Sequence, residues 1–160
     1  MSVELIIATF DDNEEQAGRV LDSIHKLAKD GALTLENAAV IVKDKEGEIK
    51  VQDPGDVDSK RGRVFGAITG GIVGLLGGPV GAIVGAAAGA ATGGVTAKLA
   101  DYGVPDKMIK DIGHGLKPGS SALIAYVTLT WVERAISLLE QNGATVSHTT
   151  LQTGDLSDRV

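Results

Sequence analysis

The sequence has 160 residues, a mass of 16.4 kDa and a formal net charge of −6. This length suits one domain with a hydrophobic core and is short for two. The acidic balance and the few aromatic residues argue against nucleic-acid binding, which usually needs a basic face with stacking side chains. The absence of cysteine excludes disulfides, thiolate metal sites and cysteine nucleophiles. The first five residues lack the pattern of a secretion signal, so we expect a cytoplasmic protein.

The N-terminal part of the chain predicts a strand, a helix and two further strands. Residues 3–10 are apolar and rich in β-branched side chains, which is typical of a strand. Apolar residues between 17 and 28 then recur at helical spacing. Residues 38–42 form a second apolar strand, and the alternation over 48–52 indicates an exposed edge strand. Residues 1–53 are therefore interpreted as a βαβ unit with a hairpin strand.

The C-terminal part repeats this order. We predict a strand over residues 122–129, a helix over 130–142 and a strand over 144–151, so that 119–151 is a second βαβ half and 152–160 a tail. Two such halves with right-handed crossovers favour one antiparallel sheet with both helices on one face. The predicted fold is an α+β ferredoxin-like sandwich.

Local signals place the ends of both predicted helices. Asp12 with Glu15 and Thr130 with Glu133 have the spacing of a capping box, in which two side chains satisfy the first free N–H groups. Gly31 follows the first helix and can adopt the left-handed conformation that ends helices. The Asn-Gly pair at 142–143 ends the second helix in the same way.

A large insertion separates the two halves. It comprises a linker (54–63), an uncharged glycine-rich segment (64–99) and an amphipathic helix (105–116) that we expect to cover the core. Half of the 22 glycines lie between residues 64 and 97. Nine of them form two rows with a spacing of four residues: Gly66, Gly70, Gly74 and Gly78 in the first row, and Gly77, Gly81, Gly85, Gly89 and Gly93 in the second.

The regular spacing of these glycines predicts close contact between helices. Each glycine costs about 1 kcal/mol relative to alanine inside a helix, so a compensating interaction is required. A row of residues without Cβ atoms forms a groove into which another helix can pack closely. The Gly-Gly-Pro sequence at 77–79 divides the segment into a helical hairpin, with arms at 64–77 and 79–99. We interpret these nine glycines as oligomerisation residues and the partner as a second copy of the chain.

Two other environments for the hairpin stay open. It can fold back on its own domain, or it can enter a bilayer from the cytoplasmic side. Lys60, Arg61, Arg63 and Lys98 flank the segment at both ends, as the positive-inside rule requires of a re-entrant hairpin at the inner face of the cytoplasmic membrane. The first arm is short for a membrane span, and the second lacks large apolar side chains over residues 85–94.

No motif predicts catalysis, a cofactor or a metal site. The three histidines, His25, His114 and His148, fall in different elements. The aspartates at 53, 56 and 58 are interpreted as a solvated linker, and the serines at 120 and 121 as part of a turn. We therefore expect a non-enzymatic protein. The alternative is a small cofactor-free enzyme or ligand-binding sensor that uses a cleft of the sheet, with contributions from Tyr126, Trp131 or His148.

The order of these segments resembles a bacterial family of unknown function. The most specific likeness is the glycine repeat together with residues 115–123, Gly-Leu-Lys-Pro-Gly-Ser-Ser-Ala-Leu. Members are commonly labelled membrane proteins and are sometimes linked to general stress. The resemblance implies the predicted architecture, membrane association and a role in the stress response, and it carries no catalytic residues. The sequence thus predicts a self-assembling protein that associates through its glycine rows.

Overall fold

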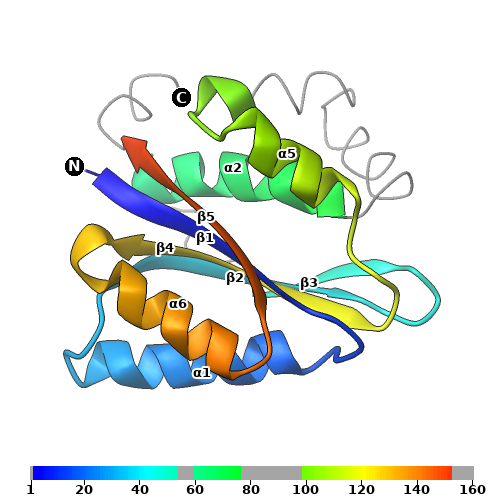
Figure 1. Cartoon of the computed structure of the whole chain (residues 1–160), viewed down its shortest axis with the longest axis horizontal. Coiled ribbons are helices and arrows are strands. Elements are labelled where there is room, and N and C mark those ends of the chain that lie inside the picture. Colours follow the sequence, from blue (N-terminus) through cyan, green and yellow to red (C-terminus); the bar gives the residue numbers. More distant parts are fainter. Residues whose placement is uncertain (1, 54–59, 77–98, 153–160) are drawn as a thin grey trace.

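A five-stranded antiparallel sheet organises the computed structural model, which describes residues 2–53, 60–76 and 99–152 (Figure 1). The strands lie in the order β3-β2-β4-β1-β5. Their bounds are Ser2–Phe10 for β1, Leu35–Lys43 for β2, Ile49–Asp53 for β3, Ser120–Thr128 for β4 and Thr145–Gln152 for β5. The fold class is therefore α+β, as predicted, and β3 is an edge strand.

Both faces of the sheet are buried. In β1, Val3, Leu5 and Ile7 contribute to one hydrophobic core, whereas Ile6 and Ala8 contribute to the other. Residues 5–8 of β1 and 122–127 of β4 are continuous apolar runs, because each successive side chain there enters a core. The sequence predicted helices of the two halves on one face of the sheet. In the structure, helices cover both faces.

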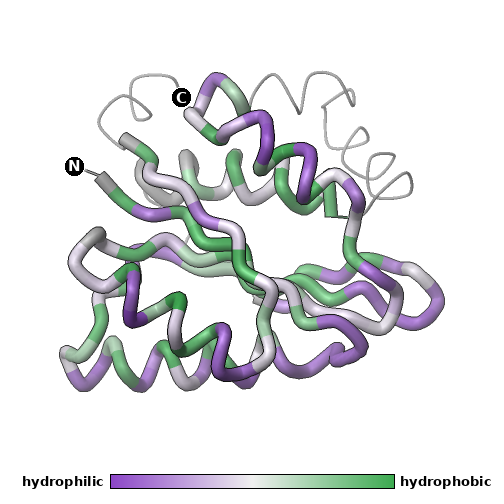
Figure 2. The backbone as a smooth tube through the Cα atoms, in the orientation of Figure 1, coloured by the Kyte–Doolittle hydropathy of each residue, from purple (hydrophilic) through white to green (hydrophobic). Residues whose placement is uncertain are grey.

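Helices α1 (Gln16–Lys29) and α6 (Val132–Gln141) cover the first face, as the sequence predicted for the helices of the two halves (Figure 1). A short 3-10 helix, η1 (Leu129–Trp131), precedes α6. Figure 2 shows apolar and polar segments alternating along both helices, as expected of surface helices with one buried stripe. The buried residues of this stripe are Ala17, Val20, Leu21 and Ile24 in α1 and Ala135 and Leu139 in α6.

Helices α2 (Lys60–Leu76) and α5 (Asp106–Gly113) cover the second face. Helix α2 includes residues 64–76 of the first predicted arm and begins four residues before it. It buries Phe65, Ile68, Ile72 and Leu76 in the core on this face of the sheet. Helix α5 packs against α2 and buries three apolar residues there, which confirms the expected covering role of this amphipathic segment.

Neither predicted capping box forms. Helix α1 begins after Glu15 without a side-chain cap from that residue, and Asp12 adopts a left-handed conformation with φ of 58°. The backbone N–H of Asp12 donates to the Oγ of Ser120 at 3.0 Å, so this residue belongs to the loop before the helix. Helix α6 begins after Trp131, again without a side-chain cap. The predicted helix ends are correct, since Gly31 and Gly143 have φ of 76° and 88°.

Candidate functional site

Helix α2 carries the part of the glycine rows that the structure describes. Gly66, Gly70 and Gly74 lie at intervals of four residues and wind slowly around the helix. Ile68 and Ile72 lie two residues further on, which is about 200° away at 100° per residue. Because Ile68 and Ile72 face the protein's own core, the glycine row lies on the side of α2 that is turned away from the sheet.

The outward side of α2 is built from small residues. Gly70 and Ala67 are exposed, whereas Gly74, one turn beyond Gly70, is buried. No heavy atom of the described residues lies within 4 Å of the position that a Cβ atom would occupy at Gly70 or at Gly74. Gly70 is therefore the open position of the groove, whereas Gly74 is already shielded from solvent.

Gly71, which belongs to neither predicted row, is filled by a residue of its own chain. A Cβ atom at Gly71 would lie 3.0 Å from Cδ2 and 3.2 Å from Cγ of Leu99. Leu99 is buried in the same core as the apolar stripe of α2. On its apolar side and at Gly71, the first arm thus packs against residues of its own subunit. The Gly70 position stays open.

The remaining predicted oligomerisation residues, Gly77, Gly78, Gly81, Gly85, Gly89 and Gly93, lie outside the described residues, as do Lys98 and most of the second arm. Lys60, Arg61 and Arg63 lie in the first turn of α2. Among the helices of the described ranges, none combines the length and apolar character that crossing a membrane requires.

A buried polar contact fixes α2 to the sheet. The hydroxyl of Tyr126 on β4 lies 2.9 Å from Oγ1 of Thr69 and donates to the backbone oxygen of Phe65 at 3.2 Å. The rings of Tyr126 and Phe65 also stack, with centroids 4.3 Å apart. Burial raises the pKa of the Tyr126 hydroxyl well above its usual value, while the contact with Thr69 lowers it to a smaller extent. The phenol therefore stays neutral and acts as an anchor for α2.

The C-terminal end of α2 is tied to the segment before β4. The N–H of Leu116 donates to the backbone oxygen of Leu76 at 2.6 Å, and the Leu116 side chain is buried in the core beneath α2. Gly119 has φ of 78°, and its N–H donates to the backbone oxygen of Lys43 at 2.8 Å. The segment that carries the family resemblance thus joins α2 to β2 and β4.

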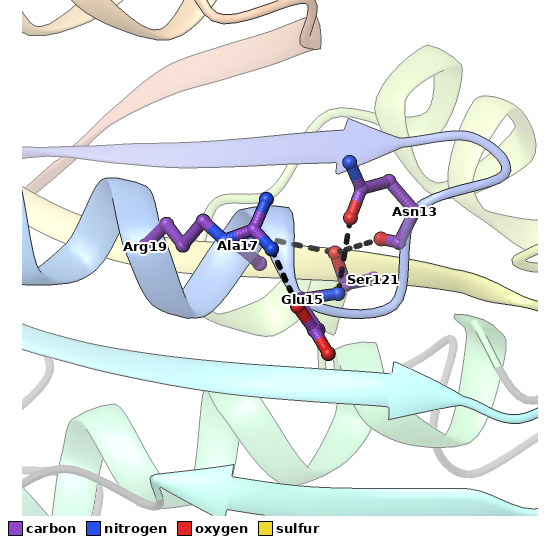
Figure 3. A network of polar contacts seen from close by, with 5 residues as sticks. All are labelled: Asn13, Glu15, Ala17, Arg19 and Ser121. Atoms are coloured by element: carbon purple, nitrogen blue, oxygen red, sulfur yellow. Dashed lines mark hydrogen bonds and ion pairs between the residues drawn. The ribbon is translucent and has the colours of Figure 1, made fainter.

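Two buried serines at the start of β4 hold the loop between β1 and α1. The Oγ of Ser121 accepts from the N–H of Ala17 at 3.1 Å and donates to the backbone oxygen of Asn13 at 2.7 Å (Figure 3). It supplies the cap of α1 that the sequence assigned to Asp12. The N–H of Glu15 donates to Oδ1 of Asn13 at 3.1 Å, which closes the turn. The sequence interpretation of a turn is therefore wrong for Ser120 and Ser121, whose side chains are fully buried in a strand.

A buried carboxylate and a histidine meet on the α1/α6 face of the sheet. The side chain of Glu4 is 6% exposed, and that of His148 is 48% exposed. Nδ1 of His148 lies 2.5 Å from Oε1 of Glu4, and Oγ1 of Thr150 donates to Oε2 at 2.7 Å. A histidine held through Nδ1 retains Nε2 for a ligand or a proton. The pairing arises because Thr150 lies opposite Glu4 across the strands and His148 lies on its diagonal.

The side chains named for an enzyme cleft do not come together. Tyr126 is buried in the core beneath α2, whereas Trp131 packs against the core beneath α1 and α6. His148 contacts Glu4. His25 and His114 are exposed on other elements. Within the described ranges, no three His, Asp or Glu residues gather as a metal site would require.

These features define an α+β protein with helices on both faces of an antiparallel sheet and a small-residue surface on one helix. Residues 64–158 match the family described as "Protein of unknown function (DUF1269)", and the chain belongs to this family. The match covers α2, α5, β4, α6 and β5 as well as the glycine rows. No curated protein and no solved structure gives a significant match.

Proposed function

We propose that this protein is a non-enzymatic, cytoplasmic assembly protein that forms homo-oligomers through the glycine rows beginning on α2. The observation that carries the proposal is the open outward side of α2 at Gly70, where no described side chain fills the groove. Two glycines four residues apart let the backbones of two helices approach, gaining dispersion contacts and Cα–H···O contacts. The apolar stripe of α2 is already buried in its own core, so among the described residues the Gly70 side is the surface left for a partner helix.

We also infer that the body carrying α2 is a ferredoxin-like sandwich, with the glycine-rich segment as its insertion. Support comes from the strands of the two βαβ halves, which follow one another in space as β2-β4-β1-β5 with α1 and α6 on one face. Strand β3 extends this sheet at the β2 edge. On this inference the helices α2 and α5 form an added layer on the second face of the sheet.

The test is a variant that fills the groove. Gly70→Leu places a large side chain at the exposed position of α2 and is expected to reduce the particle mass measured by light scattering. Far-UV circular dichroism should stay unchanged, because the sheet and its two cores are not touched. The matched control is Ser137→Leu, which places the same side chain at an exposed position of α6. An unchanged mass in the folded glycine variant contradicts the proposal.

Association with the inner face of the membrane and a role in the stress response belong to the same proposal as separate parts. The basic residues Lys60, Arg61 and Arg63 in the first turn of α2 support the membrane contact, since such clusters are attracted to anionic lipid. Flotation of the purified protein with anionic vesicles measures this contact independently of self-association.

A further inference from the structure

The two edges of the sheet differ in how they are protected. Strand β3 has five residues, carries Lys50 and Asp53, and pairs with β2 through a register shift between Val40 and Ile41. Short length, charged side chains and bulges are the devices by which proteins prevent an edge strand from pairing with another chain. The β3 edge is therefore protected.

Strand β5 has none of these devices. It is eight residues long, contains no Asp, Glu, Lys, Arg or Pro, and is rich in threonine. It pairs with β1 in an unbroken register from Thr145 to Gln152. In the described part of the chain its other side has no neighbouring strand, and Figure 1 shows it running along the border of the sheet. Within the described ranges, no other strand pairs with its backbone N–H and C=O groups on that side.

Side-chain contacts fix β5 to the rest of the sheet. Thr150 and His148 both bond to the buried carboxylate of Glu4 on β1, and Leu151 is buried in the core beneath α2. Because these residues are already fixed to β1, the strand is ordered before any partner arrives. Pairing at this edge therefore costs little conformational entropy.

We propose that β5 pairs with β5 of a second copy in antiparallel orientation, giving a continuous ten-stranded sheet across the dimer. The same edge would be used on both subunits, which is the isologous contact of a two-fold dimer. An eight-residue antiparallel pair forms about eight backbone hydrogen bonds. The charges favour this partner as well. Two chains of net charge −6 meet with least repulsion along a strip without charged side chains, and no like charges face each other across β5.

This interface stands independently of the contact through α2, because it uses the sheet edge and not the helix layer. Together, two separate self-contacts would extend the assembly beyond a dimer. The experiment is therefore done in the Gly70→Leu background as well as in the unchanged chain. In that background the dimer through β5 is expected to remain.

The chain has no cysteine, so a single introduced cysteine reports one contact. Ser147→Cys and Thr149→Cys lie on the same side of β5, and their equimolar mixture covers a register centred on His148. Mild oxidation is expected to give a disulfide-linked dimer for one of the two variants or for the mixture. Gln52→Cys on the exposed edge strand β3 is the control and should stay monomeric on a non-reducing gel.

A second measurement does not depend on disulfide geometry. Ser147→Lys with Thr149→Lys places like charges across the proposed pair and is expected to halve the particle mass in the α2 variant background. Gln52→Lys with Val51→Lys adds the same charge to β3 and should leave the mass unchanged. Absence of all three cross-links, or a folded Ser147→Lys, Thr149→Lys variant with unchanged mass, overturns the inference. Neither result depends on whether the glycine rows associate.

Discussion

The packing of α2 predicts that adjacent glycines respond oppositely to the same substitution. Gly70→Ala adds a methyl group where no described atom lies within 4 Å, so the higher helix propensity of alanine should stabilise the fold by about 0.5–1 kcal/mol. Gly71→Ala gains the same propensity but places its Cβ 3.0 Å from Cδ2 of Leu99. Leu99 is only 1% exposed and must move within a packed core, which typically costs about 1–3 kcal/mol.

The expected difference between the two variants is therefore about 1–3 kcal/mol in the free energy of unfolding, with Gly71→Ala the less stable. Urea unfolding followed by circular dichroism measures this difference, and in a chain of this size it corresponds to a shift in Tm of about 2–4 °C per kcal/mol. Both variants should be compared at the same low protein concentration, so that association does not enter the comparison. Equal stabilities of Gly70→Ala and Gly71→Ala would refute the close packing of Leu99 against α2 within the subunit. A loss of stability in Gly70→Ala would show that this position is filled.

Two further predictions concern the buried polar groups. Ser121→Ala removes the acceptor for the N–H of Ala17 and the bond to the backbone oxygen of Asn13. It should therefore lower the free energy of unfolding, measured in urea, by about 1–3 kcal/mol. The control Ser137→Ala, on an exposed position of α6, should stay within about 0.5 kcal/mol of the unchanged chain. Burial raises the pKa of Tyr126, so above about pH 10 the unfolded chain loses a proton that the folded chain keeps, and the free energy of unfolding should fall by about 1.4 kcal/mol per pH unit. Tyr126→Phe should remove this part of the slope between pH 10 and 11.5. An identical slope in both chains would contradict the burial of a neutral phenol.

The strands and helices of the two halves were predictable because their signals are local. Alternation, helical spacing and glycine stops place the elements within a few residues of their observed bounds. The second helical layer was also indicated by a signal that the prediction did not use. The runs at residues 5–8 and 122–127 are apolar without alternation, and such strands require cover on both faces.

The cap of α1 could not be predicted from spacing. Asp12 and Glu15 satisfy the local pattern, yet the acceptor for the N–H of Ala17 comes from Ser121, 104 residues away. The same holds for the pairing of Glu4 with His148, which depends on the register of β1 and β5. Contacts of this kind follow from strand order, and one sequence without related sequences contains no direct record of strand order.

The candidate site on α2 was predictable in part. The spacing of four residues predicted a continuous glycine row, and on α2 that row lies opposite the buried stripe. The sequence did not decide which of three environments buries the apolar stripe. Phe65, Ile68 and Ile72 are equally suited to the core of their own subunit, to a partner or to lipid. Strand β4 decides this choice, since Tyr126 offers a buried hydroxyl to Thr69 and a ring to Phe65 on the same side of the helix.

The segment at residues 115–123 and the glycine rows have different physical roles, although both carry the family resemblance. In the segment, the N–H of Leu116 bonds to the last residue of α2, Gly119 turns the chain into β4, and Ser121 caps α1. Each of these residues is explained by contacts inside one subunit. Gly70 has no such contact on its outward side within the described residues, although a glycine inside a helix lowers stability. No contact within the described part of the subunit makes up for the stability that Gly70 costs. This points to a contact with a partner. The stability of Gly70→Ala and the mass of the Gly70→Leu particle therefore test the same statement: the free energy of unfolding should rise in the first variant, and the particle mass should fall in the second.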